Sequence, residues 1–465
     1  MEKDATQSPD TSDSEQPSVL RIETKTSRDD PRRTGAETEG DLPPFQDADG
    51  QQPSTPPQKQ DVGPIPDGGL QAWLQVVGAT IILANTWGVI NSFGVFQAYY
   101  ETELLTSRSS SEISWIGSVQ ASLLLLVGVL SGPLFDAGYF RWLNVAGLFL
   151  IAFGHFMVSL CSEYWQLLLA QGFCVGIGMG LVFLPSAAIT SQYFSRHRAL
   201  ALGISSAGSP VAGIVYPIIF SRLQPIIGFG WATRVIAFIL LALSVIPVLF
   251  MRTRLPPSGK MRAIIDKTAA HDKPYLAFVS AGFLCFLALY VPFFYITVFA
   301  TSHKTTTDDF APYLVTMLNV GSVPGRLIPN ALADRVGCLN MMIVCVFASS
   351  MIAWGWLGVE NLGGSVVFAL LYGGFSGGVV SLTPSVILQI SPDPSRVGTR
   401  LGMSFLSTGT AVLIGTPIAG AILGGYSNAE WLGVMSYGAA GLLLATCLYS
   451  TSRFLLYKRN GRWRD

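Results

Sequence analysis

Charged residues are scarce in this chain of 465 residues. Asp, Glu, Lys and Arg make up 12% of the sequence, against about 25% in soluble domains, whereas hydrophobic residues make up 50%. This composition excludes an ordinary soluble domain and predicts a protein built for a lipid bilayer. The formal net charge is zero, so charge identifies no partner, and we expect no nucleic acid to bind.

Motifs that would hold a metal, a nucleotide or a catalytic group are also missing. The six cysteines form no CxxC pair or Cys/His cluster. Gly176, Gly178 and Gly180 are followed by apolar residues and lack the lysine of a phosphate-binding loop. No carboxylate lies in the middle of an apolar run, and His155, which does, is expected to be a buried structural residue. We therefore predict a protein that is not an enzyme and uses neither metal nor cofactor.

The first 66 residues (1–66) differ from the rest of the sequence. They are rich in Ser, Thr, Pro, Gln, Asp and Glu and have almost no aromatic residues. Such a segment cannot bury enough apolar surface to fold, so we expect a disordered cytosolic tail. No apolar run follows Met1 closely, which argues against a cleaved signal peptide.

Apolar runs of roughly twenty residues recur from Gly69 onward, each long enough to cross ~30 Å of hydrocarbon. The longest polar connection, 252–274, follows the sixth run. We therefore predict an all-α polytopic membrane protein with twelve transmembrane helices, in two six-helix halves at 67–251 and 275–452, and a short basic tail at 453–465. The predicted spans are 73–98, 114–135, 142–161, 165–190, 199–221, 230–250, 275–300, 312–332, 339–358, 363–390, 399–424 and 430–451.

Lys and Arg follow the positive-inside pattern. If the N-terminus is cytosolic, the inner loops and the C-terminal tail hold most of the positive residues. The outer loops then hold only Arg108, Arg222, Arg234 and Lys304. We therefore predict that both termini are cytosolic, and the plasma membrane is the expected location.

Matching segments in the two halves indicate an internal repeat. GMGLVFLPSAAI at 178–189 corresponds to GGVVSLTPSVIL at 377–388, and GPLFDAGYFR at 132–141 corresponds to PNALADRVG at 329–337. Because both pairs share nearly the same offset, we infer that the halves have the same fold. Two such halves are the plan of the major facilitator fold, in which the substrate site lies between them.

A polar stripe runs along the eighth predicted span. Asn319, Ser322, Arg326 and Asn330 are spaced by three, four and four residues, so they share one face of a helix. A charge this far inside a membrane costs at least ~2.5 kcal/mol and should face the protein interior. Arg326 either satisfies neighbouring carbonyl groups or pairs with an anionic ligand, and the sequence leaves both alternatives open.

Several motifs resemble the monocarboxylate porter family of the major facilitator superfamily. PDGGLQAW at 66–73 resembles the start of its first span, and the blocks 178–210 and 228–238 are similar to its fungal branch. GPLFDAGYFR resembles the superfamily's loop between spans two and three, with Gly138 one place early. The resemblance covers about 67–455 and implies a carrier that works by alternating access. We expect it to work as a monomer.

Two departures from the family pattern concern proton coupling. Animal lactate porters carry a Lys in span one where this chain has Asn91, and an Asp one turn before the span-eight Arg where it has Ser322. Arg326 itself matches the family. The resemblance therefore implies an anion-pairing Arg, whereas the residues that couple lactate to protons are incomplete.

We hypothesise a secondary-active transporter that moves a small organic anion, such as a monocarboxylate or a carboxylate-bearing metabolite. Polar groups around Arg326 and nearby aromatic walls would form its site. The predicted substrate-binding residues are Arg326, Asn91, Asn319, Ser322, Tyr290 and Tyr372. The alternatives are an efflux pump for a fungal secondary metabolite and a non-transporting nutrient sensor of the same fold.

Charges at the cytosolic helix ends suggest a second site. Such charges can bridge the two halves in one state of a carrier and separate when the halves rock. We predict that two acid–base pairs form this gate. The predicted gating residues are Asp136, Arg141, Asp334 and Arg335.

Overall fold

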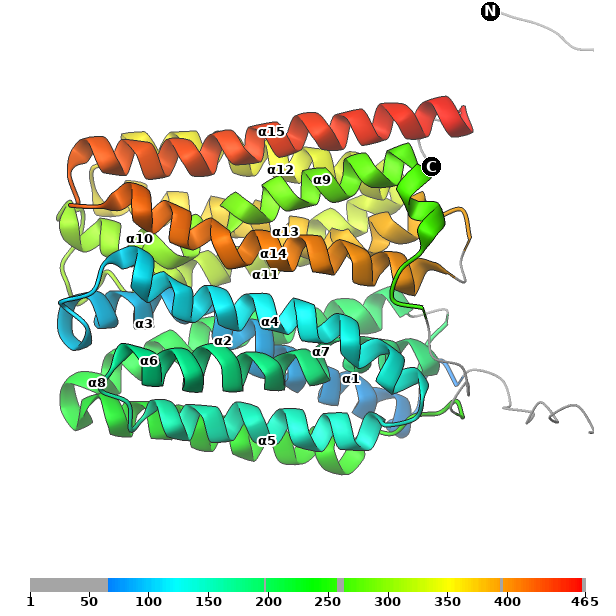
Figure 1. Ribbon diagram of the computed structural model, residues 1–465, viewed down its shortest axis with the longest axis horizontal. Helices are drawn as coiled ribbons and strands as arrows, with labels where there is room; N and C mark the ends of the chain where they lie inside the picture. Colours follow the sequence, from blue (N-terminus) through cyan, green and yellow to red (C-terminus); the bar gives the residue numbers. More distant parts are fainter. Residues whose placement is uncertain (1–65, 196–197, 257–262, 394–395, 462–465) are drawn as a thin grey trace, which may run out of the picture. The chain divides into compact units, whose positions relative to one another are not determined.

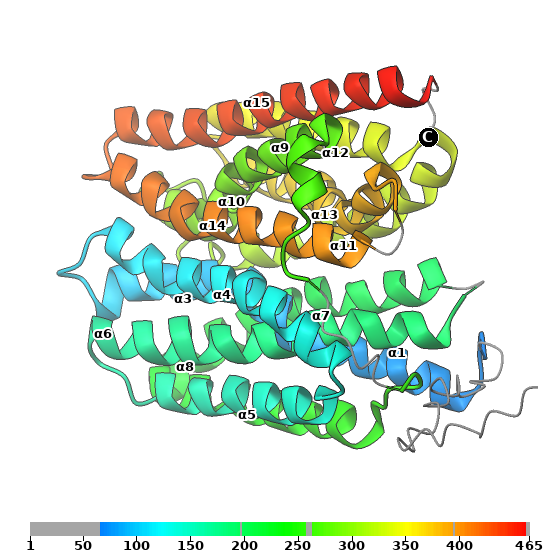
Figure 2. The same ribbon diagram turned by 45° about the vertical axis from the view of Figure 1, so that its right-hand side comes forward.

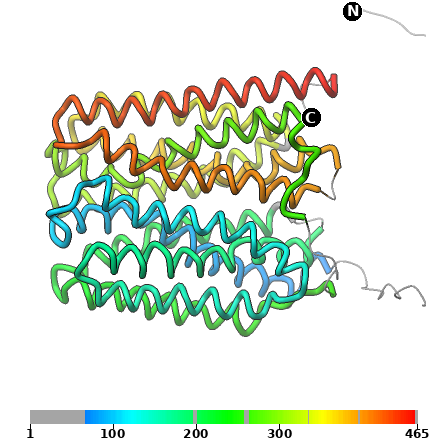
Figure 3. Tube along the Cα trace, in the orientation of Figure 1, coloured from blue at the N-terminus to red at the C-terminus, as the bar shows by residue number. Residues whose placement is uncertain are grey.

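The computed structural model describes residues 66–195, 198–256, 263–393 and 396–461, within which the chain is helical and has no strand. The predicted disordered tail, apart from its last residue, lies outside these ranges. Figures 1 and 2 show two groups of helices, one from α1 to α8 and the other from α9 to α15. The Cα trace in Figure 3 follows the chain through the first group before it enters the second.

The first group contains spans one to six. Span one is interrupted by two π-helical turns, a feature that often accompanies functional sites. Its pieces are α1 (Leu70–Leu83), a turn at Ala84–Gly88, α2 (Val89–Asn91), α3 (Phe93–Tyr99) and a turn at Tyr100–Leu104. The other spans are α4 (Ser110–Asp136), α5 (Phe140–Val158), α6 (Tyr164–Leu167) continued through Leu168–Val175 into α7 (Gly176–Tyr193), and α8 (Arg198–Phe250).

The second group contains spans seven to twelve. Span seven is α9 (Lys273–Leu289) followed by α10 (Val291–Ser302), and Tyr290 stands at the join. The following spans are α11 (Tyr313–Val336), α12 (Cys338–Gly355), α13 (Leu362–Ile390), α14 (Val397–Leu423) and α15 (Asn428–Asn460). Short 3₁₀ turns lie at Lys267–His271, before α9, and at Trp356–Gly358, after α12.

The predicted number of spans is confirmed. Ten segments of the described chain are long and apolar enough to cross a membrane. One of them, Leu200–Phe250, has 51 residues, or ~75 Å of helix, which is more than twice the thickness of a bilayer. Gly228, with φ 77°, breaks it into two spans. α11 is not among the ten because its polar stripe lowers its hydropathy, and with these two corrections there are twelve.

The helix bundle has two ends, which we call the terminal end and the far end. The terminal end carries the start of α1 and the end of α15, and the far end carries the connections 105–109, 303–312 and 424–427. Local sequence fixes far-end boundaries: Ser109 and Glu112 form a capping box at the start of α4, and Ser427 and Glu430 form another at α15.

Three helix pairs make most of the contacts between the two groups: α3 with α10, α4 with α14, and α8 with α11. Glycine allows the closest approaches. A Cβ on Gly94 of α3 would clash with the carbonyl oxygen of Phe293 on α10, and a Cβ on Gly213 of α8 would clash with the side chain of Asn319 on α11. The two halves are therefore in close contact at these glycines, with backbone against backbone at Gly94.

Large apolar side chains cover much of the outside of the bundle. Trp142 at the terminal end and Trp165 and Trp231 at the far end are exposed, as are many Leu, Ile, Val and Phe residues between them. Tryptophan favours the two membrane–water interfaces, and aliphatic side chains favour the hydrocarbon between. This distribution is that of a multi-pass membrane protein.

Candidate functional site

Arg326 lies on α11 at the boundary between the two halves, and its side chain is buried. Its Nη1 donates to the carbonyl oxygen of Ser206 at 3.3 Å, and its Nη2 donates to Ser209 Oγ at 3.4 Å, both on α8. Its Nε donates to Ser322 Oγ, one turn earlier on α11, at 3.4 Å. The guanidinium therefore contacts both halves, but only through neutral groups and at the long end of hydrogen-bond distances.

No Asp or Glu of the described residues lies within 4.0 Å of the Arg326 guanidinium. Buried charges in proteins are ordinarily paired, because an uncompensated charge away from water is costly. The polar stripe predicted from the sequence is thus an inward-facing one. Its central cation has neutral partners and no counter-ion within the described chain.

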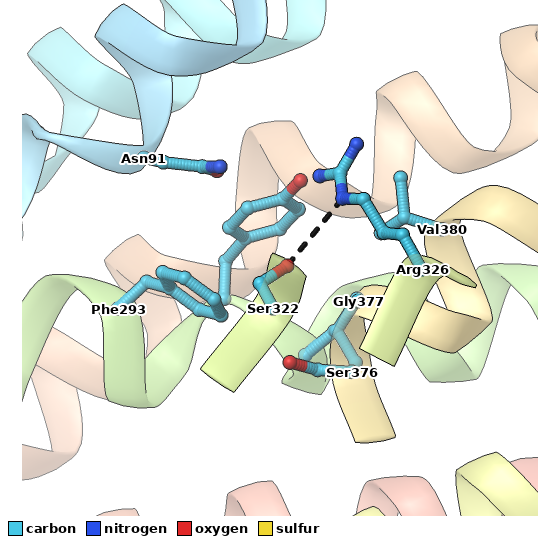
Figure 4. Close-up of a pocket in the computed structure, with 9 residues that line it drawn as sticks. Asn91, Phe293, Ser322, Arg326, Ser376, Gly377 and Val380 are labelled. Carbon is cyan, nitrogen blue, oxygen red and sulfur yellow. Dashed lines mark hydrogen bonds between the residues drawn. The ribbon is translucent and has the colours of Figure 1, made fainter. Parts of the chain in front are cut away.

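A small pocket lies beside Arg326, and Figure 4 shows that Arg326 and Asn91 approach it from opposite sides. Its volume is about 10 Å³, which is room for a single water molecule. The pocket lining combines polar groups with two aromatic rings. The residues that line it are Asn91, Leu289, Tyr290, Phe293, Ser322, Arg326, Ser376, Gly377 and Val380.

Four of the predicted substrate-binding residues meet in this pocket: Arg326, Asn91, Ser322 and Tyr290. The Asn91 Nδ2 donates to Ser209 Oγ at 3.2 Å, so Asn91 and Arg326 share the same hydroxyl. Tyr290 lies at the join of α9 and α10. Its ring stacks on Trp87 of the first π-helical turn, with centroids 6.3 Å apart.

Two predicted residues lie outside the pocket lining. Asn319 donates to the Val315 carbonyl at 2.9 Å, and its Oδ1 is buried without a partner among the described residues. The Tyr372 hydroxyl donates to the carbonyl of Leu289 at 2.8 Å, at the end of α9. Sequence spacing placed Asn319 on the correct face but could not show that Gly213 packs against it.

Sequence reasoning missed the partners that α8 and α13 supply. Ser206 and Ser209 of α8 bind the guanidinium, and Ser376 of α13 lines the pocket. Ser206 and Ser209 are three residues apart in span five, which is a helical spacing that repeats the pattern of the stripe on span eight. Only Ser209 uses its side chain, however, since Ser206 accepts through its backbone carbonyl, and no residue type marks such a contact in a sequence.

The predicted gating residues lie at the terminal end. Asp136 ends α4, Arg141 is exposed in the first turn of α5, and Arg335 is exposed in the last turn of α11. Asp334 is also in that turn, but its side chain lies outside the described part of the structure. A latch formed by these residues stays a prediction.

A group of ion pairs at the terminal end was not anticipated from the sequence. It joins the connection before α9 to the start of α14 and the end of α15. Arg400 Nε lies 3.1 Å from Asp266 Oδ2, and Arg400 Nη1 lies 2.6 Å from Asp272 Oδ2. Arg396 contacts Asp266, and Arg459 contacts Asp272, each at 3.2 Å. We call Asp266, Asp272, Arg396, Arg400 and Arg459 the linker cluster.

A much larger cavity, of about 910 Å³, lies between the two halves at the far end. We call it the far-end cavity. Along α3 and α10 its lining begins at Val95 and Thr297, one turn beyond Asn91 and Phe293 of the Arg326 pocket. The contact of Gly94 with Phe293 lies between these positions. The two spaces are therefore neighbours along the same pair of helices, separated by this contact.

Comparisons with known proteins agree with this architecture. Residues 73–365 match the model of the Major Facilitator Superfamily. The MFS-type transporter dbaD of Emericella nidulans is 45% identical over 379 residues, which cover 82% of this chain and 85% of the relative. The aspyridones efflux protein apdF of the same fungus is 37% identical over 408 residues, covering 88% and 82%. The MFS transporter asaE of Aspergillus flavus is 37% identical over 443 residues, covering 92% and 100%.

Proposed function

Because this chain belongs to the Major Facilitator Superfamily, and is thus a multi-pass membrane transporter, we propose that it exports an organic anion through contact with Arg326. The observation that carries the proposal is the buried guanidinium of Arg326, which has only neutral partners from both halves. A carboxylate or similar anion would complete the site with charge-assisted hydrogen bonds, which are shorter and stronger than the present ones.

The comparisons favour export of a metabolite over uptake of a small monocarboxylate. One relative is named as an efflux protein for aspyridones, and the other two names state transport without a substrate. The monocarboxylate porter resemblance stays a prediction, since the matching model is that of the whole superfamily. We therefore assign the substrate to carboxylate-bearing metabolites and the direction to export.

Arg326 links anion binding to movement of the halves. In the present state its Nη1 and Nη2 bind Ser206 and Ser209 across the boundary, at 3.3 and 3.4 Å. An incoming carboxylate competes for the same two donors and forms the stronger bidentate pair. Binding therefore removes these two hydrogen bonds between α11 and α8 and makes rocking of the halves about the remaining contacts easier.

Export of an anion needs no proton partner under this proposal. We place the terminal end in the cytosol, following the distribution of Lys and Arg. When a singly charged anion leaves a cell with a negative interior, its electrical free energy falls by ~2.3 kcal/mol per 100 mV of membrane potential. By the resemblance to the monocarboxylate porter family, the neutral Asn91 and Ser322 stand where lactate porters carry proton-coupling groups.

Flux in proteoliposomes tests the proposal. We would measure flux of labelled lactate, salicylate and fluorescein, with neutral salicylamide as the matched analogue, under an imposed pH gradient or an imposed potential. Arg326→Gln is expected to lower anion flux at least tenfold, because a hydrogen bond to a charged group contributes about 1.5–3 kcal/mol. Arg326→Lys keeps the charge but not the planar fork and should restore flux in part.

Arg108→Gln, which changes an exposed arginine at the far end, is the control and should behave like the parent protein. All variants are compared at equal amounts of reconstituted protein. Anion flux that responds to the potential and requires Arg326 supports the proposal. Flux unchanged in Arg326→Gln, or salicylamide flux equal to that of salicylate, refutes it.

A further inference from the structure

The far-end cavity has an unbalanced set of charges. Its lining includes the carboxylates of Glu103, Asp308 and Asp309 and one guanidinium, that of Arg222, for a formal charge of −2. Arg222 lies over the ring of Tyr313 at 5.6 Å, a contact that joins α8 to α11 across the two halves. The surroundings do not compensate, because the other charged residues at the far end are also mostly acidic. They are Glu101, Arg108, Glu112, Glu163, Arg234, Lys304, Glu360 and Glu430.

The rest of the lining is apolar and aromatic. Tyr99, Phe220, Phe310 and Tyr313 line the cavity together with aliphatic residues of α3, α8 and α10. The ring of Tyr99 stacks on that of Phe229, which is outside the lining, with centroids 5.2 Å apart, and this contact fixes the position of the wall. Such walls accommodate the skeleton of an apolar organic molecule, and the volume of about 910 Å³ far exceeds that of a three-carbon acid.

Two hydroxyl groups of the lining also lack partners. The Oγ1 of Thr297 and the Oγ of Ser221 are buried without a hydrogen-bond partner among the described residues. Buried hydroxyls are nearly always hydrogen-bonded in folded proteins. They come from different halves, Thr297 from α10 and Ser221 from α8. A ligand with polar substituents that shifts the neighbouring side chains would satisfy both.

We propose that the far-end cavity is a second ligand site, through which an aromatic or extended apolar organic acid leaves after it is released from Arg326. The inference rests on the proposed export of an organic anion. The aromatic wall holds the apolar skeleton, and Glu103, Asp308 and Asp309 repel the anionic group. The substrate class is thereby narrowed to acids with a large apolar skeleton.

The charges act on rates of release and rebinding, while the driving force still sets the direction. In water, a carboxylate roughly 8 Å from an anion lowers the local concentration of that anion about twofold. Two carboxylates together change it about fourfold, and salt weakens the effect because the screening length is ~8 Å at physiological ionic strength. An anion that has left the cell is therefore slow to return to Arg326.

The field of the cavity can be measured without a substrate. Thr301, which lines the cavity and is partly exposed, is replaced by Cys, and its reaction with cationic MTSET and anionic MTSES is timed at low salt, with labelling of the parent chain subtracted. Adding Asp308→Asn and Asp309→Asn should make MTSES react about fourfold faster and MTSET slower. Adding Glu360→Gln instead, an exposed far-end carboxylate outside the lining, should change neither rate.

A second measurement tests the role in release. Fluorescein added on the far-end side should inhibit export of labelled fluorescein from proteoliposomes, and Asp308→Asn with Asp309→Asn should lower its half-inhibitory concentration about fourfold. If the thiol rates are the same with and without Asp308→Asn and Asp309→Asn, the proposed negative field of the cavity is refuted. If the half-inhibitory concentration of fluorescein is unchanged, the proposed role of the cavity in release is refuted. Anion flux that survives in Arg326→Gln refutes the role of Arg326 in export, whereas the thiol rates still report on the cavity.

Discussion

Replacing Arg400 by Met is expected to lower the free energy of unfolding by about 3 kcal/mol. The Arg400 side chain is buried in the linker cluster and holds two carboxylates, Asp266 at 3.1 Å and Asp272 at 2.6 Å. Met has a similar volume, so the main change is the loss of charge. Each carboxylate keeps one other cation, Arg396 or Arg459, but these are partly exposed. The cost therefore falls at the lower end of the range for a broken buried pair.

The pH dependence separates the contribution of Asp266. The hydroxyl and backbone amide of Thr268 and the guanidinium of Arg400 stabilise the carboxylate, which lowers the pKa of Asp266 from 3.8 to about 2. Because the folded-state pKa lies below the unfolded value, this group stabilises the fold above about pH 4. This contribution is lost as the pH falls from about 4 to about 2. Asp266→Asn should remove that part of the acid sensitivity.

The free energies of unfolding of the parent protein and the variants are compared by SDS-induced unfolding in mixed micelles at pH 7, monitored by tryptophan fluorescence. Arg108→Gln is the matched control, because Arg108 pairs with Glu112 at 3.2 Å but both side chains are exposed. Such a pair contributes less than about 0.5 kcal/mol. If Arg400→Met is no less stable than Arg108→Gln, the linker cluster does not hold the connection before α9, and the reasoning is refuted.

Two further predictions concern contacts between the halves. Gly94→Val should abolish flux, because its side chain would push into the carbonyl of Phe293, whereas Gly132→Ala, which meets nothing within 4 Å, should transport normally at equal protein yield. Tyr426→Phe removes the hydroxyl that donates to Glu101 at 3.0 Å. The loss should destabilise the contact between the halves at the far end by about 1 kcal/mol, which should appear as faster thiol labelling of nearby cysteines. Equal flux in the two glycine variants, or unchanged labelling, would contradict these expectations.

The sequence was sufficient for the fold because lipid imposes a simple rule. A membrane span must be apolar over about twenty residues, so the spans could be located without knowledge of their neighbours. The predicted gap between spans five and six, 222–229, contains Gly228, whose φ of 77° breaks the helix there. The stripe on α11 was predictable for the same reason, since helical periodicity alone places Ser322 and Arg326 on one face.

Contacts between distant segments were not predictable from one sequence. Ser206 and Ser209 meet Arg326 because α8 packs on α11, and a spacing within one helix carries no information on its partner. The linker cluster is a similar case. Asp266 and Arg400 are 134 residues apart, and the sequence placed Asp266 in the polar connection 252–274 and Arg400 at the start of the span 399–424, with nothing to pair them.

The internal repeat duplicates the fold but not the charge. Asp136 and Asp334 occupy matching places after spans two and eight, yet the position that precedes Asp136 as Arg326 precedes Asp334 is Gly128. The cation therefore belongs to one half only, and the described residues of the other half offer it a carbonyl and a hydroxyl. A second Arg at that position would repel Arg326 across the boundary instead of pairing with it. Under the proposed function, an anion completes the pair with this single cation and competes with Ser206 and Ser209 for the contact that joins the halves.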